Sequence, residues 1–270
     1  MRRQASFPTI RVIGALSATL SLLSTNVLAS KTYYIDEWVD FPAPGQTCSQ
    51  NDLNTVTASL RSAMDADLWT GVRYVDTSAW PQDFWEQNRV TGGLDHVYGD
   101  TKTVTVYAGP GTPGTIYCGP HNDACTASTG SHMRLGAGPG SSGGTTALAV
   151  WLACEVPHVD FLAGETALNN VRQQLGWLNI ISIGDNEPRD VYNKTKTQAN
   201  KDAWIWTMNG AGGRNPATGA SENRKPVVVT GTTVASADTC WWYHDNQSWG
   251  QDRQDLMSGQ AAQICWEWLD

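Results

Sequence analysis

Three things are scarce in this sequence of 270 residues. Positive charge is low, because 18 lysines and arginines stand against 26 aspartates and glutamates. Zinc-binding patterns such as His-Glu-x-x-His or paired Cys-x-x-Cys are missing, as is a calcium-binding loop pattern, so we predict no metal site and no cofactor. After residue 29 no apolar run approaches the roughly 20 residues that a helix needs to cross a bilayer.

The first 29 residues have the pattern of a secretory signal peptide. Arg2 and Arg3 give the positive start, residues 12–24 are apolar, and residues 27–29 form a small-residue cleavage site. Residues 1–29 contain no acid and three arginines, so the rest of the chain carries 15 basic and 26 acidic residues, a net charge of −11. That charge repels phosphate backbones and anionic lipid heads, which argues against a nucleic-acid partner. We expect a secreted or periplasmic protein that does not span a membrane once the signal is removed.

The six cysteines of this chain are an even number, which fits an oxidising compartment and a set of disulfides. Two pairs suggest themselves by position in the sequence, the first of them around a Gly-Pro turn. The predicted pairs are Cys118 with Cys125 and Cys240 with Cys265. Cys48 and Cys154 remain.

Residues 30–270 are long enough for one domain with one substantial core. Apolar runs of strand length alternate with helical patterns, which predicts an α/β fold with a doubly wound, mostly parallel sheet and helices on both faces. The run 147–153 contains no polar residue and is the best candidate for a buried central strand. The other expected strands are 32–35, 72–75, 103–108, 177–183 and 226–230, and the expected helices are 53–64, 165–175 and 195–208; residues 241–243 and 264–269 are edge strands or a packed cap.

Two familiar patterns lose support from their context. Residues 109–114 match the dinucleotide fingerprint G-x-G-x-x-G, but residues 115–120 contain no helix start, so no helix amides would face a pyrophosphate. Carboxylate pairs for glycoside hydrolysis are a minority alternative, because several acids follow predicted strands. These acids are Asp36, Glu37, Glu155, Asp185 and Glu187.

The more informative pattern joins two strands. Gly109, Pro110 and Gly111 follow the strand 103–108, and Cys154 follows the strand 147–153. This arrangement resembles the caspase, gingipain and legumain group of cysteine peptidases, where one strand ends in His-Gly and the next ends in a small residue and the nucleophilic cysteine. The resemblance implies a caspase-like three-layer sandwich with Cys154 as nucleophile and the N–H groups of Gly111 and Cys154 as an oxyanion pocket.

The chain is also similar to an uncharacterised group of secreted bacterial proteins. The similarity rests on Cys48 followed by Asn-Asp-Leu at residues 51–53, and on Trp-Leu-Ala-Cys at residues 151–154. Both motifs are short.

The chain departs from the peptidase pattern at Pro110, which occupies the position of the catalytic histidine. A thiol with a pKa of about 8.5 is mostly protonated at neutral pH and depends on that imidazole, so the resemblance implies impaired catalysis. His121 is the first substitute base to consider, and His132 and His158 follow. Cys154 has two other possible states, a disulfide with Cys48 or a buried structural thiol.

These observations lead to one functional hypothesis and two alternatives. The first is a secreted cysteine-peptidase homologue that binds a polypeptide or a cell-envelope component without efficient cleavage. The second is an active cysteine peptidase in which His121 replaces the missing base. The third is a carbohydrate-binding module that uses exposed tryptophans from the set Trp204, Trp206, Trp241, Trp242 and Trp249.

Overall fold

The computed structural model describes most of the chain after the expected signal peptide. The described residues are 31–38, 53–117, 126–128, 132–133, 135, 144–157, 171–179, 183–209, 224–251, 255, 257 and 261–268. The expected signal peptide lies outside these ranges, as do the candidate residues Cys48, Cys118, Cys125, His121 and His158.

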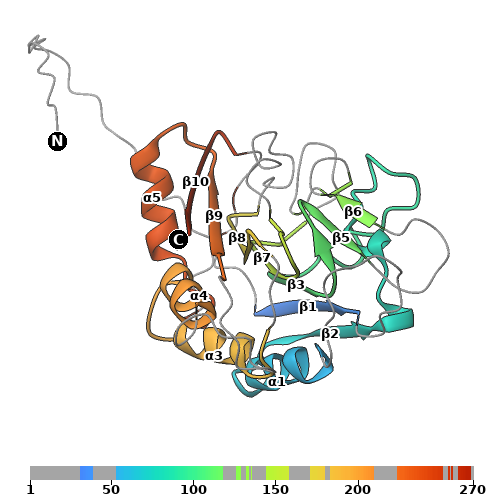
Figure 1. The fold of residues 1–270 in the computed structure, drawn as a ribbon. Coiled ribbons are helices and arrows are strands. Elements are labelled where there is room, and N and C mark those ends of the chain that lie inside the picture. Colours follow the sequence, from blue (N-terminus) through green and yellow to red (C-terminus); the bar gives the residue numbers. More distant parts are fainter. Residues whose placement is uncertain are drawn as a thin grey trace, which may run out of the picture.

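A seven-stranded sheet forms the centre of the described structure (Figure 1), with the strand order β10-β9-β8-β7-β3-β1-β2. Strands β2, β1, β3, β7 and β8 run parallel, whereas β9 is antiparallel to β8 and β10 is antiparallel to β9. The strands are β1 (Thr32–Glu37), β2 (Thr70–Val75), β3 (Val104–Ala108), β7 (Leu148–Leu152), β8 (Gln173–Trp177), β9 (Pro226–Thr232) and β10 (Gln263–Trp268). The predicted α/β fold with a mostly parallel sheet is confirmed.

The remaining elements are four helices, two short 3₁₀ helices and a small second sheet within the described ranges. The helices are α1 (Leu53–Ala66), α3 (Glu187–Lys194), α4 (Asn200–Met208) and α5 (Ala237–Asn246), and the 3₁₀ helices are η1 (Asp76–Ser78) and η2 (Pro81–Phe84). The second sheet has the order β4-β5-β6, with β4 (Gly111–Thr112), β5 (Thr115–Tyr117) and β6 (Thr126–Ser128).

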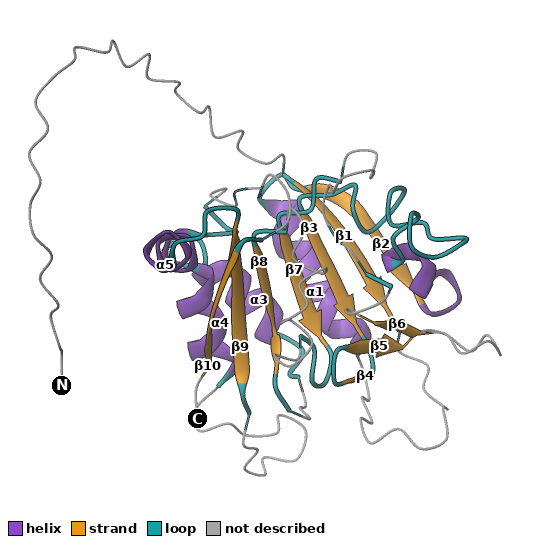
Figure 2. Cartoon of the chain, turned by 90° about the horizontal axis from the view of Figure 1, so that it is seen from above, coloured by secondary structure: helices purple, strands orange, loops and turns teal. Residues whose placement is uncertain are grey.

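Helices α1, α3 and α4 cover one face of the large sheet (Figure 2). The apolar positions of α1 recur with helical spacing, so Leu60 and Met64 share a side and both are fully buried. They belong to the same core cluster as Val106 of β3, Val150 of β7 and Trp204 of α4. Truncating a buried leucine of this kind costs about 2–5 kcal/mol, so this layer makes a large contribution to stability.

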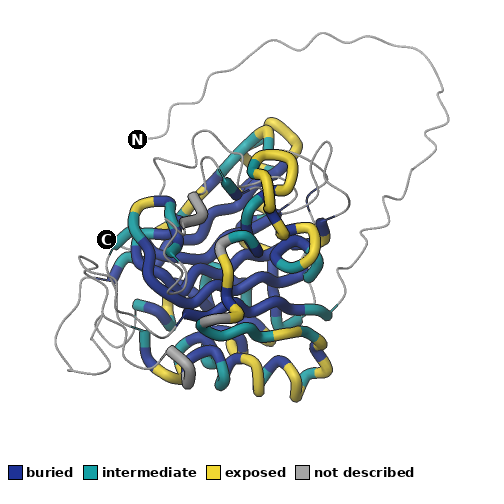
Figure 3. The backbone as a smooth tube through the Cα atoms, turned by 90° about the vertical axis from the view of Figure 1, so that its right-hand side faces the viewer, coloured by how far each residue is buried: buried dark blue, intermediate teal, exposed yellow. Residues whose placement is uncertain are grey.

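The opposite face is covered, among the described residues, by η2 and the connections around it. Phe84 of η2 packs edge-on against Tyr107 of β3 at 5.8 Å between ring centroids. The hydroxyl of Tyr34 on β1 donates a 2.6 Å hydrogen bond to Asp83 of η2 inside this layer. The central strands are therefore buried on both sides, as Figure 3 shows by the dark blue of the tube through the middle of the molecule.

The helix predicted at residues 165–175 is wrong over its described part, because Gln173–Trp177 forms the strand β8. The polar residues Gln173 and Gln174 hide this strand from a search for apolar runs. Both are fully buried, and their amides are paired: Gln173 accepts from Asn200 at 2.8 Å, and Gln174 accepts from Trp151 at 2.7 Å. Burial of polar residues is tolerated when their hydrogen bonds are made.

The C-terminal part of the chain is joined by a disulfide. Cys240 of α5 is bonded to Cys265 of β10, with 6.0 Å between their Cα atoms, so the predicted pairing of these two residues is confirmed. The predicted edge strand at 264–269 is present as β10, whereas residues 241–243 belong to helix α5. In the described part of the chain no helix has the length and apolar character needed to cross a membrane.

Candidate functional site

The carboxyl ends of β3 and β7 meet at one rim of the sheet. Ala108 is the register partner of Leu152, and the N–H of Gly109 donates to the carbonyl oxygen of Leu152 at 3.2 Å. Beyond these strands, Gly111 lies so close to Cys154 that a Cβ on Gly111 would overlap the Cys154 carbonyl oxygen. The structure therefore brings Gly111 and Cys154 together, at the edge where α/β folds commonly build their sites.

Cys154 is fully buried and disulfide-bonded. Of the three states considered from the sequence, this is the disulfide. The two paired cysteines of the C-terminal part are bonded to each other, so the partner of Cys154 is one of the three remaining cysteines. These are Cys48, Cys118 and Cys125, all outside the described residues. A sulfur held in a disulfide cannot ionise to the thiolate that attacks a carbonyl.

Pro110 immediately precedes β4 of the small sheet and is held by two hydrogen bonds. Its carbonyl oxygen accepts from the Tyr117 N–H at 3.2 Å and from the Tyr107 hydroxyl at 3.1 Å. The chain that follows Pro110 forms the antiparallel pair β4 and β5, not a helix. The sequence-based expectation that no helix follows residues 109–114 is confirmed, so no helix N-terminus is available there for a pyrophosphate.

Three of the five histidines lie in the described residues, where each contacts an aromatic ring, a carboxylate or a hydroxyl. The His132 ring lies 5.6 Å from the Trp85 ring, and the His96 ring nitrogen lies 3.8 Å from Asp95. His244 of α5 is buried against β9, where its Nδ1 is 2.9 Å from the Thr230 hydroxyl, and burial lowers its pKa to about 4. His121 and His158, the other two candidate bases, lie outside the described residues.

The accessible groups at this rim come from the hairpin and from the turn after β7. Thr112, Tyr117 and Glu155 are half-buried, and Pro113 is exposed. The hydroxyls of Thr112 and Tyr117 are 3.1 Å apart, and the Gly114 N–H donates to the Glu155 carbonyl oxygen at 3.1 Å. Glu155 has a φ of 55°, so its turn redirects the chain immediately after the disulfide-bonded cysteine. The partly exposed groups at this rim therefore include a tyrosine and a glutamate.

Two of the acids proposed for glycoside hydrolysis are partners of arginines. Glu37 lies 2.6 Å from Arg73 and accepts from Thr57; burial raises its pKa, and these two partners oppose the rise. Glu187 lies 2.7 Å from the fully buried guanidinium of Arg224. Both carboxylates therefore have structural bonds that account for their positions.

The five tryptophans considered for sugar binding divide into two groups. Trp204 and Trp249 are buried in the core, so their part of that prediction is wrong. Trp206, Trp241 and Trp242 are 68%, 41% and 55% exposed.

The sequence matches no protein-family model, and a search of the curated proteins finds no significant relative. The resemblance to the caspase group therefore rests on the short motifs given above and on the observed fold.

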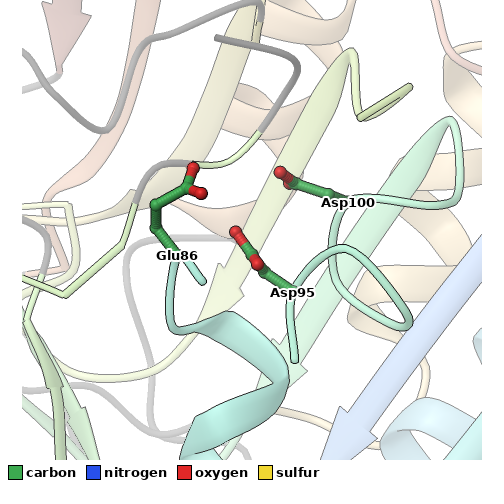
Figure 4. A group of neighbouring side chains, drawn as sticks. All are labelled: Glu86, Asp95 and Asp100. Atoms are coloured by element: carbon green, nitrogen blue, oxygen red, sulfur yellow. The ribbon is translucent and has the colours of Figure 1, made fainter. Parts of the chain in front are cut away.

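Sequence reasoning missed a group of three buried carboxylates, Glu86, Asp95 and Asp100, whose oxygens lie within 4.8 Å of one another (Figure 4). Their spacing of nine and five residues matches none of the patterns searched for. The missed signal was a set of acids in a segment that also carries aromatic core residues.

Proposed function

We propose that the protein is a caspase-like homologue that binds an extended polypeptide outside the cytoplasm and does not cleave it. The observation that carries this proposal is the state of Cys154, which is buried and disulfide-bonded at the position of the family's nucleophile. At the position of the family's general base stands Pro110, whose ring has no proton acceptor. In this state the protein therefore has neither a free thiol to attack a peptide carbonyl nor, at position 110, a base to activate that thiol.

The sheet topology supports the comparison with the caspase group. The strands that carry Pro110 and Cys154 are parallel neighbours in the middle of the sheet, and their carboxyl ends share one rim. The Cys240–Cys265 disulfide fits an oxidising compartment, which is consistent with the proposed secretion.

The rim surface, defined here as Thr112, Pro113, Tyr117 and Glu155, is where the polypeptide would bind. An aromatic ring, a carboxylate and a hairpin present both an apolar contact and a charge to an extended chain. Since the chain after the signal has a net charge of −11, a polypeptide rich in lysine and arginine is favoured over an acidic one.

The test for cleavage uses a mixed peptide library with the wild-type protein, before and after mild reduction. The variant Cys154→Ser removes the candidate nucleophile. Cys240→Ser is its matched control, because it also breaks one disulfide but leaves Cys154 in place. We expect no hydrolysis from any of these proteins. Turnover that is lost in Cys154→Ser and in His121→Ala, but kept in Cys240→Ser, would contradict the proposal and establish the active peptidase with a substitute histidine.

The test for binding uses the same library without hydrolysis as readout. Basic peptides retained by the wild type are expected to bind several-fold more weakly to Glu155→Gln, because the rim surface loses its charge. Asp238→Asn removes one exposed acid on α5 and serves as the matched control. Equal binding by both variants and the wild type would remove the rim surface from the proposal.

Carbohydrate binding is the second candidate, and the exposure of three tryptophans favours it. Trp206 lies on α4, and Trp241 and Trp242 lie on α5. If they stack on sugars, a glycan panel should change the tryptophan fluorescence, and Trp206→Ala or Trp242→Ala should remove the change. Unchanged fluorescence across the panel would reject this candidate.

A further inference from the structure

The buried carboxylates Glu86, Asp95 and Asp100 lie on the connection between β2 and β3, on the face of the sheet opposite α1. Glu86 comes two residues after η2, and the two aspartates follow in the turns before β3. Figure 4 shows the three carboxyl groups pointing toward one another from two separate parts of this connection. We call them the carboxylate triad.

Backbone hydrogen bonds hold the triad in place. The Asp95 N–H donates to the Trp85 carbonyl oxygen at 3.4 Å, and the Asp100 N–H donates to the Asp95 carbonyl oxygen at 2.7 Å. The Asp100 carbonyl oxygen in turn accepts from the Thr145 N–H at 2.6 Å, which joins the segment to the chain entering β7. The arrangement is thus built by the fold and does not depend on mobile side chains meeting at a surface.

Each of two triad members has one bonded oxygen and one free oxygen. Glu86 Oε1 accepts from the Asn88 side chain at 3.0 Å, and Asp95 Oδ1 accepts from the His96 N–H at 2.8 Å and the Gln87 N–H at 3.2 Å. Glu86 Oε2 and Asp95 Oδ2 are buried and have no hydrogen-bond donor among the described residues. Both residues are about 1% exposed, so bulk solvent does not reach these oxygens.

This arrangement is costly unless something neutralises it. A buried polar atom without a partner costs about 1–3 kcal/mol, and a buried charge without a partner costs more. The His96 ring nitrogen lies 3.8 Å from Asp95 Oδ1, the oxygen that is already bonded.

We propose that the carboxylate triad binds one calcium ion, with Glu86 Oε2 and Asp95 Oδ2 as its ligands together with the Asp100 carboxylate. Oxygens on opposite sides of a calcium ion are about 4.6–5.2 Å apart, since each bond is 2.3–2.6 Å long, and the triad oxygens lie within 4.8 Å. Calcium also accepts irregular sets of protein oxygens. Carbonyl oxygens and waters would complete the six to eight oxygens that calcium takes, whereas magnesium requires near-ideal octahedral geometry with shorter bonds of about 2.0–2.1 Å.

The consequence of binding would be structural. A calcium ion at the triad would tie the residue after η2 to the turns before β3, and so would fasten the layer that covers this face of the sheet. The triad shares no residue with the rim surface, and the proposal does not depend on the proposed function.

The experiment is a titration of the full-length secreted protein with calcium chloride after treatment with a chelator, followed by calorimetry and thermal unfolding. We expect one calcium ion per chain with a dissociation constant below about 1 mM, and a rise in Tm of about 5 °C at saturation. Magnesium chloride should bind at least about tenfold more weakly. Glu86→Gln and Asp95→Asn should each weaken calcium binding at least about tenfold.

Asp83→Asn is the matched control, because Asp83 is an equally buried acid of the same connection outside the triad. It should bind calcium as the wild type does. The amides in Glu86→Gln and Asp95→Asn also relieve repulsion, so both variants should fold in chelator at least as well as the wild type. The absence of binding up to about 10 mM calcium, equal affinity for magnesium, or unchanged binding by the two triad variants would overturn the proposal.

Discussion

Asp95 should make the protein less stable as the pH rises from about 4 to about 7 when calcium is removed. Its pKa rises from the ordinary 3.8 to about 7 in the folded chain, because of burial and the Glu86 carboxylate. Between these two values the folded state binds the proton and the unfolded state does not, so the free energy of unfolding falls with rising pH and levels off above about 7. Below about 4 the contribution is fully present.

The size of this effect follows from the two pKa values. At about 1.4 kcal/mol for each pH unit, the full difference corresponds to about 4 kcal/mol. Relaxation and water entry around a carboxyl group in a turn reduce it, and we expect about 2 kcal/mol. The assay is urea unfolding in chelator from pH 4 to 8, comparing the wild type with Asp95→Asn. The curve of the variant should be flatter by about this amount, whereas parallel curves would refute the reasoning.

Three further predictions concern stability and are checked by urea unfolding at neutral pH. Tyr34→Phe removes the donor from the buried Asp83 carboxylate and should cost about 1–3 kcal/mol, whereas no loss would show that the 2.6 Å bond is not needed. Gly111→Ala places a Cβ against a backbone carbonyl oxygen and should cost about 1–3 kcal/mol; wild-type stability would contradict the close approach. Replacing Cys240 and Cys265 together by serine opens a crosslink with a sequence separation of 25 and should cost about 3.5 kcal/mol, and a cost below about 1 kcal/mol would contradict this.

The centre of the sheet could be predicted from the sequence because its strands are uniformly apolar. Residues 147–153 contain the observed β7, and residues 103–108 contain β3. The neighbouring position of their ends then followed from the topology of parallel α/β sheets. This part of the candidate site needed no side-chain detail.

Elements that are stabilised by polar contacts between distant residues could not be predicted from the sequence. Strand β8 depends on glutamine amides that are paired with Asn200 and Trp151. The helix expected at 195–208 is α4, but it begins only at Asn200, because the separate helix α3 ends at Lys194 and a turn follows it. The Thr195 hydroxyl donates to the Tyr192 carbonyl oxygen where α3 ends. Local periodicity carries no information on such bonds.

The carboxylate triad was missed for a related reason. Its members converge because turns 86–100 are fixed to the chain that enters β7, and the Asp100–Thr145 bond spans 45 residues. A search for acids at fixed spacing finds loops whose ligands are close in sequence. Burial of the acids, which only the fold reveals, is the signal that distinguishes the triad from acids on a solvated surface.

The most direct test of the central claim is alkylation of the native protein with iodoacetamide at neutral pH without reductant, followed by peptide mapping. We expect Cys154 to remain unlabelled and to appear in a disulfide-linked peptide. Its side chain packs in the same core cluster as Val56 of α1, and Cys48 precedes that helix, so we expect Cys48 to be the partner. Rapid labelling of Cys154 would show a free reactive thiol and would contradict the proposal that this rim binds without cleaving.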